Sequence, residues 1–226
     1  MPAGKLFQSF DESWQSFLGR REPLESIIEE IPADTPDGTR AVVWLLRPDA
    51  GTVARAVAAQ QSLPEFHWLR RLPPGFLHVS VGQVAREGDV DVATELERGR
   101  AAVADRAPFE LEVPRLTCFH TAVVAELEPR DRVADIHARL FPARTFETLL
   151  PHLTLAVLTE RAPVEPLRDV LVPLRDTHLG HFSVDEVALC LVPWTRATFL
   201  AHWEVAGVAP LMATPQNPKA QPPPPA

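Results

Sequence analysis

Residues 40–206 alternate short apolar runs with segments of helical periodicity, and this alternation constrains the fold more than any other feature of the chain. Strands are expected at residues 40–47, 76–84, 109–116, 119–127, 152–158, 182–192 and 198–205. Helices are expected after Asp49 or Thr52, after Asp89 or Asp91, from Pro129, and at residues 164–171. Several neighbouring strands, among them 109–116 with 119–127, are close enough to form antiparallel hairpins. The order of elements therefore favours an α+β fold over a doubly wound parallel sheet.

The two ends of the chain differ in composition from this body. Residues 1–39 carry eight acidic and three basic residues, with apolar residues at helical spacing from Leu6 to Leu18. We expect an acidic helical extension there. From residue 207 the chain loses charge and gains proline, ending in Pro222–Pro225. Such a segment predicts a disordered or polyproline-like tail over residues 207–226, and one folded domain over residues 40–206.

Several features bear on the cellular setting. No apolar run approaches the roughly 20 residues that a membrane helix needs, so no membrane partner is expected. Asp11 and Glu12 stand near the N-terminus without an apolar segment, which argues against a secretory signal. Cys118 and Cys190 are the only cysteines, which excludes a disulfide framework and a cysteine-based zinc site. We expect a cytoplasmic protein.

The charge distribution limits the partners. The chain has a formal net charge of −8 and contains no run rich in lysine or arginine. A protein that holds many phosphates of a long nucleic acid carries a basic stripe, so a long nucleic acid is not expected as a partner. The expected partner is a small nucleotide or an RNA end held at a local site. The expected state is a monomer.

A short internal repeat contains the candidate catalytic residues. Residues 75–81, Gly-Phe-Leu-His-Val-Ser-Val, are echoed by residues 149–155, Leu-Leu-Pro-His-Leu-Thr-Leu. Because side chains alternate along a strand, His78 and Ser80 share one face while their apolar neighbours point to the other. The same alternation places His152 and Thr154 together. Each repeat therefore predicts one imidazole beside one hydroxyl on a strand whose other face is anchored in the core.

Two such strands facing one another across a cleft form a symmetric site of two imidazoles and two hydroxyls. A neutral imidazole can remove a proton from water while an imidazolium protonates a leaving oxygen. Imidazole titrates near pH ~6.5, so both forms are accessible near neutrality. The hydroxyls can donate to a phosphoryl oxygen as negative charge develops there. This chemistry requires no metal and no cofactor.

These motifs resemble those of the 2H phosphoesterases, which include RNA 2′,3′-cyclic phosphodiesterases, also called 2′-5′ RNA ligases. The similarity covers the two His-x-Ser/Thr motifs, their separation of 74 residues, and the closing strand at residues 182–189. It implies a bilobal, pseudo-symmetric α+β fold in which two antiparallel sheets line a central cleft with helices outside. It also implies phosphodiester chemistry in which His78 donates a proton, His152 accepts one, and Ser80 and Thr154 hold the phosphoryl oxygens.

The sequence departs from many members of that family near both motifs. Val157 stands where many relatives have an arginine after the second motif, and Gln83 stands where others have an aromatic residue after the first. A phosphate contact must then come from another residue, and Arg71, Arg144 and Arg196 are the candidates.

Other candidate residues have ordinary structural interpretations. His178 and His181 have a spacing that can bind metal, but no third ligand is evident in the sequence, so no metal site is predicted. His137 lies on an apolar helix face and is expected to be a hydrogen-bonded structural residue. The aromatic residues Phe119, Trp194 and Trp203 can stack on a base, although core or rim packing is the favoured interpretation.

Two alternatives to an RNA 2′,3′-cyclic phosphodiesterase remain open. One is an enzyme of the same family that acts on a small nucleotide, such as an ADP-ribose cyclic phosphate or a 2′-5′ oligoadenylate. The other is a non-catalytic module that binds nucleotides or RNA ends, or a scaffold that uses the acidic N-terminal segment and the proline-rich tail. Both His-x-Ser/Thr motifs are intact, which favours an enzyme.

Overall fold

The computed structural model describes residues 8–143, 150–198 and 202–212. The helices are α1 (Phe10–Gly19), α2 (Ala50–Gln61), α3 (Val92–Val103), α4 (Arg130–Leu140) and α5 (Val164–Leu174), with short 3-10 helices η1 (Ile27–Glu30), η2 (Pro74–Phe76) and η3 (Glu87–Asp89). The strands are β1 (Arg40–Leu46), β2 (Leu69–Arg71), β3 (Val79–Arg86), β4 (Phe109–Glu112), β5 (Leu116–Cys118), β6 (Ala122–Glu126), β7 (His152–Leu158), β8 (His181–Val184), β9 (Glu186–Pro193) and β10 (Glu204–Pro210). Helices mixed with antiparallel strands confirm the predicted α+β class.

The main sheet consists of two halves joined at one point. Its strand order is β10-β9-β1-β3-β7-β6-β5, with β2 paired to β7, and a separate ribbon is formed by β4 and β8. The central strands β3 and β7 pair through a single residue pair, Val79 with Leu153. The predicted two lobes are therefore present as two antiparallel half-sheets of one sheet: β10-β9-β1-β3 is the first, and β7-β6-β5 with β2 is the second.

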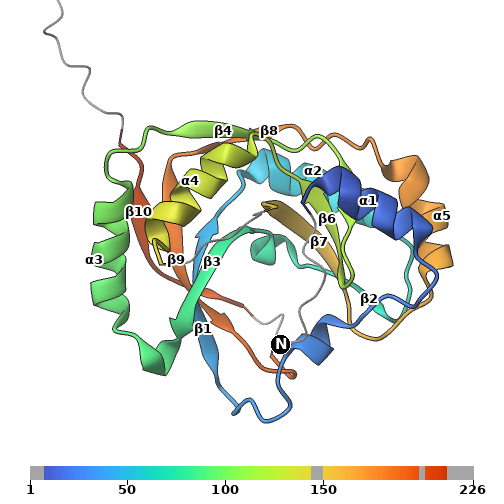
Figure 1. Ribbon diagram of the computed structural model, residues 1–226, viewed down its shortest axis with the longest axis horizontal. Coiled ribbons are helices and arrows are strands. Elements are labelled where there is room, and N and C mark those ends of the chain that lie inside the picture. The colour runs from blue at the N-terminus through green and yellow to red at the C-terminus, as the bar shows by residue number, and fades with distance from the viewer. Residues whose placement is uncertain (1–7, 144–149, 199–201, 213–226) are drawn as a thin grey trace, which may run out of the picture.

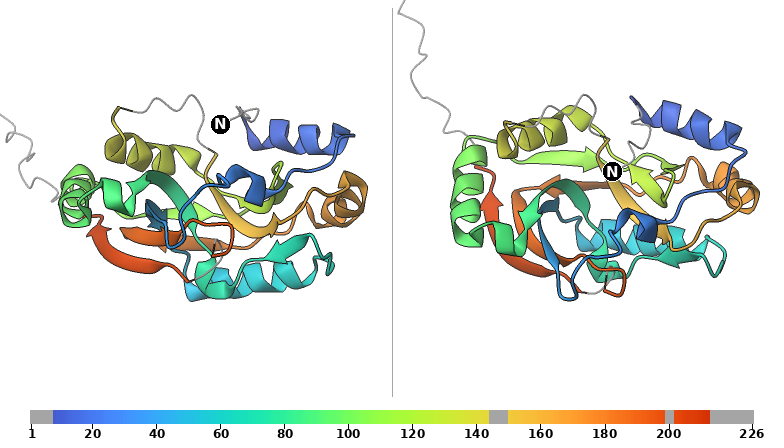
Figure 2. Two further views of the ribbon diagram at one scale, coloured as in Figure 1. Left: turned by 90° about the horizontal axis from the view of Figure 1, so that it is seen from below. Right: turned by 60° about the horizontal axis from the view of Figure 1, so that its bottom comes forward.

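The helices cover both half-sheets (Figure 1). Helix α3 packs on β10 and beside α4, whereas α1 and α5 pack on β5, so that α3 and α5 lie at opposite ends of the molecule. Figure 2 shows α1 and α4 on one side of the sheet and α2 on the other. Among the described residues, no helix is both long enough and apolar enough to cross a membrane.

The helix starts follow from acidic and hydroxyl caps. The Asp49 carboxylate accepts a hydrogen bond of 2.6 Å from the Thr52 backbone N–H at the start of α2. Asp91 likewise accepts one of 2.7 Å from the Thr94 N–H at the start of α3. Such side chains satisfy backbone donors that have no partner within the helix. Of the two starting positions left open for each helix, the structure selects Asp49 and Asp91.

A close helix contact organises the core of the first half-sheet. Trp44 of β1 is fully buried, and its indole N–H donates a 2.7 Å hydrogen bond to the Glu95 carboxylate of α3. One helical turn later, Gly99 lies so close to the indole that an added Cβ would stand 2.1 Å from Trp44 Cζ2. Gly99 therefore permits the close approach of α3 to the sheet.

The acidic N-terminal segment packs on the second half-sheet. Helix α1 begins at Phe10 and buries Trp14 and Phe17 in a cluster with residues of β5, β7 and α5. The Arg175 guanidinium lies 4.7 Å from the centre of the Trp14 ring. The Ser13 hydroxyl donates a 3.2 Å hydrogen bond to the carbonyl of Cys118 in β5. These contacts hold α1 against the second half-sheet, and the chain continues from α1 to η1.

Two strand predictions are corrected. Residues 109–116 do not pair with 119–127 along their length, because β4 pairs with β8 and only β5 pairs with β6. Pro114, which has no N–H to donate, lies between β4 and β5 and separates them. The run 182–192 is likewise two strands, β8 and β9, that separate at Asp185.

The expected boundary of the tail at residue 207 is also wrong. Strand β10 runs from Glu204 to Pro210 and pairs with β9 over this length, where 198–205 was predicted. Ala209 and Leu211 are buried. Residues 207–210 therefore belong to the edge strand of the sheet, which packs against α3, and not to the tail. The rest of the predicted tail, residues 213–226, lies outside the described residues.

Candidate active site

A cavity of about 370 Å³ lies where the two half-sheets meet. All four predicted site residues line it: His78 and Ser80 from the first motif, and His152 and Thr154 from the second. His78 directly precedes β3, and His152 is the first residue of β7. The prediction that the two motifs face one cleft is confirmed.

The pairing of Val79 with Leu153 explains why the motifs meet. Both residues are fully buried, and each is the central residue of its His-x-Ser/Thr motif. Residues on either side of a strand position project to the opposite face of the sheet, and residues opposite one another in an antiparallel pair project to the same face. A single backbone pair therefore places both imidazoles and both hydroxyls on the cavity side.

The two imidazoles are held in the same way. His78 Nδ1 donates a 2.7 Å hydrogen bond to the carbonyl oxygen of Phe76, and His152 Nδ1 donates one of 2.8 Å to the carbonyl oxygen of Leu150. In each motif the acceptor is two residues before the histidine. Because a carbonyl oxygen can only accept, Nδ1 carries the proton of the neutral ring. Nε2 is then the atom that each ring offers to a ligand.

Aromatic side chains surround both rings. Phe76 and Trp203 meet His78 edge to face, with ring centres 5.4 Å and 6.2 Å away. Phe119 meets His152 in the same way at 4.8 Å. These contacts remove water from the sides of the imidazoles and restrict their rotation. Phe119 and Trp194 are partly buried against the core and also line the cavity, which agrees with the favoured core or rim packing and leaves both rings within reach of a ligand.

Burial sets the protonation state of both histidines. Desolvation lowers the pKa of His78, the hydrogen bond to Phe76 opposes this, and the nearby His152 lowers the pKa further. Desolvation also lowers the pKa of His152, against the hydrogen bond to Leu150. Burial disfavours the charged form of an imidazole, so both rings favour the neutral form at pH 7.

The motif hydroxyls, Ser80 Oγ and Thr154 Oγ1, are available to a ligand. Ser80 is exposed and Thr154 is half-buried. Within the described ranges, neither hydroxyl makes a hydrogen bond to the protein. Both can donate to an oxygen atom that enters the cavity between the two rings.

The rest of the cavity wall is mostly apolar and carries one carboxylate. No lysine or arginine in the described part of the chain lines it, whereas Glu30 of η1 does. Desolvation and the charge of Glu25 raise the pKa of Glu30, and a hydrogen bond from Thr121 lowers it. Sequence reasoning missed Glu30 and Thr121, because no motif marks them.

Arg71 and Arg196, two of the three arginines named as substitutes for the family's arginine, do not line the cavity. Arg71 donates to the carbonyl of Leu63, and Arg196 donates to the carbonyl of Ile31 at 3.0 Å. Arg144 lies outside the described residues. Val157 and Gln83, the two positions that depart from the family pattern, both face the cavity.

Comparison with known proteins agrees with this geometry. Residues 91–191 match the family model of the 2′-5′ RNA ligase superfamily. This confirms the resemblance to the 2H phosphoesterase superfamily. The matched range contains the second His-x-Ser/Thr motif, with His152 and Thr154, and ends within β9. No curated protein matches the sequence of the chain.

Solved structures share the 2H fold at low sequence identity. TT0787 of Thermus thermophilus has a TM-score of 0.56 and 16% identity, covering 76% of this chain and 98% of its own. LigT of E. coli in its apo form has a TM-score of 0.56 and 13% identity, covering 75% and 96%. ATU0111 of Agrobacterium tumefaciens, a conserved protein of unknown function, has a TM-score of 0.56 and 17% identity, covering 86% and 97%.

The remaining histidines lie outside this cavity. His137 of α4 is buried, and its Nδ1 donates a 2.7 Å hydrogen bond to the carbonyl oxygen of Val81, so its structural interpretation is confirmed. His178 and His181 lie near the end of the β4–β8 ribbon, beside Glu112.

Proposed function

We propose that the chain is a metal-independent phosphodiesterase that opens 2′,3′-cyclic phosphates at the ends of RNA or on nucleotides. The observation that carries this proposal is the matched pair of imidazoles, each with Nδ1 bonded to a backbone carbonyl and Nε2 left for a ligand in one cavity. Because both rings line one cavity, one can accept a proton while the other donates one to the same substrate.

The proposed reaction is a displacement at phosphorus. Nε2 of neutral His152 accepts a proton from water as the water oxygen bonds to phosphorus. The bond from phosphorus to the ribose 3′ oxygen breaks, and Nε2–H of protonated His78 supplies the proton to that oxygen. The product is a 2′-phosphate with a free 3′ hydroxyl. The same displacement, with the 5′ hydroxyl of a second ribose in place of water, forms a 2′-5′ linkage and frees the 3′ hydroxyl.

His78 becomes protonated, as a proton donor must be, with the help of the negative charge of the substrate. Burial lowers the pKa of both histidines, so the free protein favours two neutral rings. A phosphate anion between the rings raises their pKa values, because an opposite charge within a few ångströms favours the charged form. Ser80 and Thr154 donate hydrogen bonds to the non-bridging oxygens, where negative charge increases as the water oxygen attacks.

The cavity favours a small substrate. Its volume of about 370 Å³ suits one nucleotide, and Phe119 and Trp194 on its wall can stack on a base. Its wall offers no lysine or arginine, within the described residues, to hold a run of phosphates. E. coli LigT, which shares the fold, has been crystallised with 3′-AMP and with ATP.

A substrate panel tests this proposal. The panel holds 2′,3′-cyclic nucleotides, RNA with a 2′,3′-cyclic end, 2′-5′ dinucleotides and ADP-ribose cyclic phosphate, each with EDTA present. We expect turnover of at least one cyclic phosphate and no loss of this activity in EDTA. We expect the activity to be lost in His78→Ala and in His152→Ala. The variant His67→Ala, which replaces an exposed histidine, is the control. Saturable binding without turnover of any member would favour a non-catalytic binding module, and restoration by zinc after EDTA would contradict the mechanism.

A further inference from the structure

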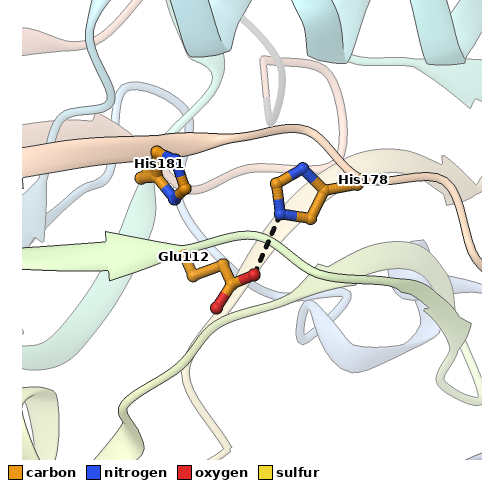
Figure 3. A group of neighbouring side chains, drawn as sticks. All are labelled: Glu112, His178 and His181. Atoms are coloured by element: carbon orange, nitrogen blue, oxygen red, sulfur yellow. Dashed lines mark hydrogen bonds and ion pairs between the residues drawn. The ribbon is translucent and has the colours of Figure 1, made fainter.

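Three side chains of metal-binding type meet near the end of the β4–β8 ribbon (Figure 3). Glu112 comes from the last position of β4, His181 from the first position of β8, and His178 from the segment before β8. Their ligand atoms all lie within 4.8 Å of one another, and all three residues are exposed. Figure 3 shows the Glu112 carboxylate pointing toward His178, with which it forms a hydrogen bond, and the His181 ring on the neighbouring strand.

The backbone fixes this arrangement. Glu112 and His181 are direct partners in the register of β4 and β8. The next residue, Val113, bonds both ways to the loop that carries His178: its N–H donates to the Gly180 carbonyl at 2.8 Å, and its carbonyl accepts from the Leu179 N–H at 2.9 Å. Gly180 has a φ of +83°, a conformation that glycine adopts readily. The three side chains therefore start from one rigid backbone unit.

We propose that Glu112, His178 and His181 bind a divalent transition-metal ion, with Zn²⁺ as the preferred ion. Two imidazoles and one carboxylate are zinc donors, at about 2.0–2.2 Å from the ion. Tetrahedral coordination at that distance places the ligand atoms about 3.3 Å apart. His178 Nε2 and Glu112 Oε1 are already 2.9 Å apart. Because all three side chains are exposed, their rotation is sufficient to bring a ring nitrogen of His181 to the same ion.

The ion replaces an existing hydrogen bond. His178 Nε2 now bonds to Glu112, and Nδ1 accepts from the Gly180 N–H at 3.1 Å. Coordination through Nε2 requires the ring proton to move to Nδ1, which breaks the bond from Gly180. Binding through two imidazoles and a carboxylate compensates for both bonds, and three protein ligands leave a fourth position for water.

The charge around the site favours a cation. A pocket beside it is lined by Glu110, Glu112, Glu128, Pro129 and His181. Two imidazole donors with a single carboxylate ligand select zinc, cobalt, nickel or copper over magnesium and calcium, which prefer oxygen ligands. This site shares no lining residue with the cavity of the two motifs, so it is independent of the proposed phosphodiesterase function.

Metal titration of the full chain, produced without a histidine tag and stripped with chelator, tests the site. We expect saturable binding of one Zn²⁺ per chain in competition with a chromogenic chelator, and a melting temperature that rises with zinc concentration. We expect the absorption spectrum of bound Co²⁺ to show the d–d bands of a tetrahedral site. Mg²⁺ and Ca²⁺ should produce neither effect.

Variants separate this site from incidental surface binding. His178→Ala, His181→Ala and the conservative Glu112→Gln should each weaken zinc binding at least about tenfold, at unchanged circular dichroism. The matched control is His67→Ala, because His67 is an exposed histidine 3.9 Å from the Glu160 carboxylate with no third ligand in the described metal-binding groups. Zinc binding that is absent, that survives the three changes, or that falls equally in His67→Ala overturns the proposal.

Discussion

Removal of either cavity histidine should remove one specific limb of the pH–rate profile. If His152 is the proton acceptor and His78 the donor, kcat/KM of the wild-type protein follows a bell in pH, since activity needs one neutral and one protonated ring. Desolvation lowers the pKa of both rings. Both limbs therefore lie at lower pH than free imidazole would give, and we expect the optimum below pH ~6.5.

The magnitudes follow from the roles. His78→Ala and His152→Ala should each lower kcat/KM by about 10²–10⁴-fold, the usual contribution of one general acid or base. Each factor of ten corresponds to about 1.4 kcal/mol in the activation free energy. The double variant should lose much less than the product of the two factors, because groups that act together are not additive.

The remaining limb in each variant identifies the role of the remaining ring. His152→Ala should lose the acidic limb and keep the basic one. That basic limb should still lie at lower pH than free imidazole would give, because desolvation is the largest cause of the lowered pKa of His78. His78→Ala should lose the basic limb. Initial rates on a cyclic nucleotide from pH 4.5 to 9, in buffers of constant ionic strength, measure these limbs. If both variants lose the same limb, or if either variant keeps a bell-shaped pH–rate profile, the assignment of acid and base is refuted.

Further predictions concern the cavity wall and the core. Removing the two motif hydroxyls together should lower kcat more than it changes KM, and by less than removal of one histidine, in steady-state assays. Glu30→Gln should lower KM for an anionic substrate a few-fold, because a carboxylate on the wall repels phosphate; Glu29→Gln, outside the cavity lining, should leave KM unchanged. Gly99→Ala should lower the free energy of unfolding in urea by about 1–3 kcal/mol, since its Cβ would overlap Trp44. Gly88→Ala, which meets nothing within 4 Å, is its control, and equal losses would argue against overpacking.

The sequence alone determined the local features of this protein. Alternation along a strand placed His78 with Ser80 and His152 with Thr154, because neighbouring side chains must point to opposite faces. The capping aspartates and the helical periodicity located α2 and α3, since capping depends on residues within one turn. The α+β class and the candidate catalytic residues follow from such local rules and from the resemblance of the two motifs.

Only the tertiary structure decided which local features meet. The single pair of Val79 with Leu153 brings the motifs together, and it depends on packing between half-sheets that no local pattern encodes. Glu112 becomes a partner of His181 through the pairing of β4 with β8, strands that lie far apart in the sequence. Glu30 reaches the cavity because α1 anchors the N-terminal segment on the second half-sheet. The physical reason is the same in each case: strand register and helix docking are set by burial of distant surfaces against one another, and a residue's neighbours in the chain do not determine them.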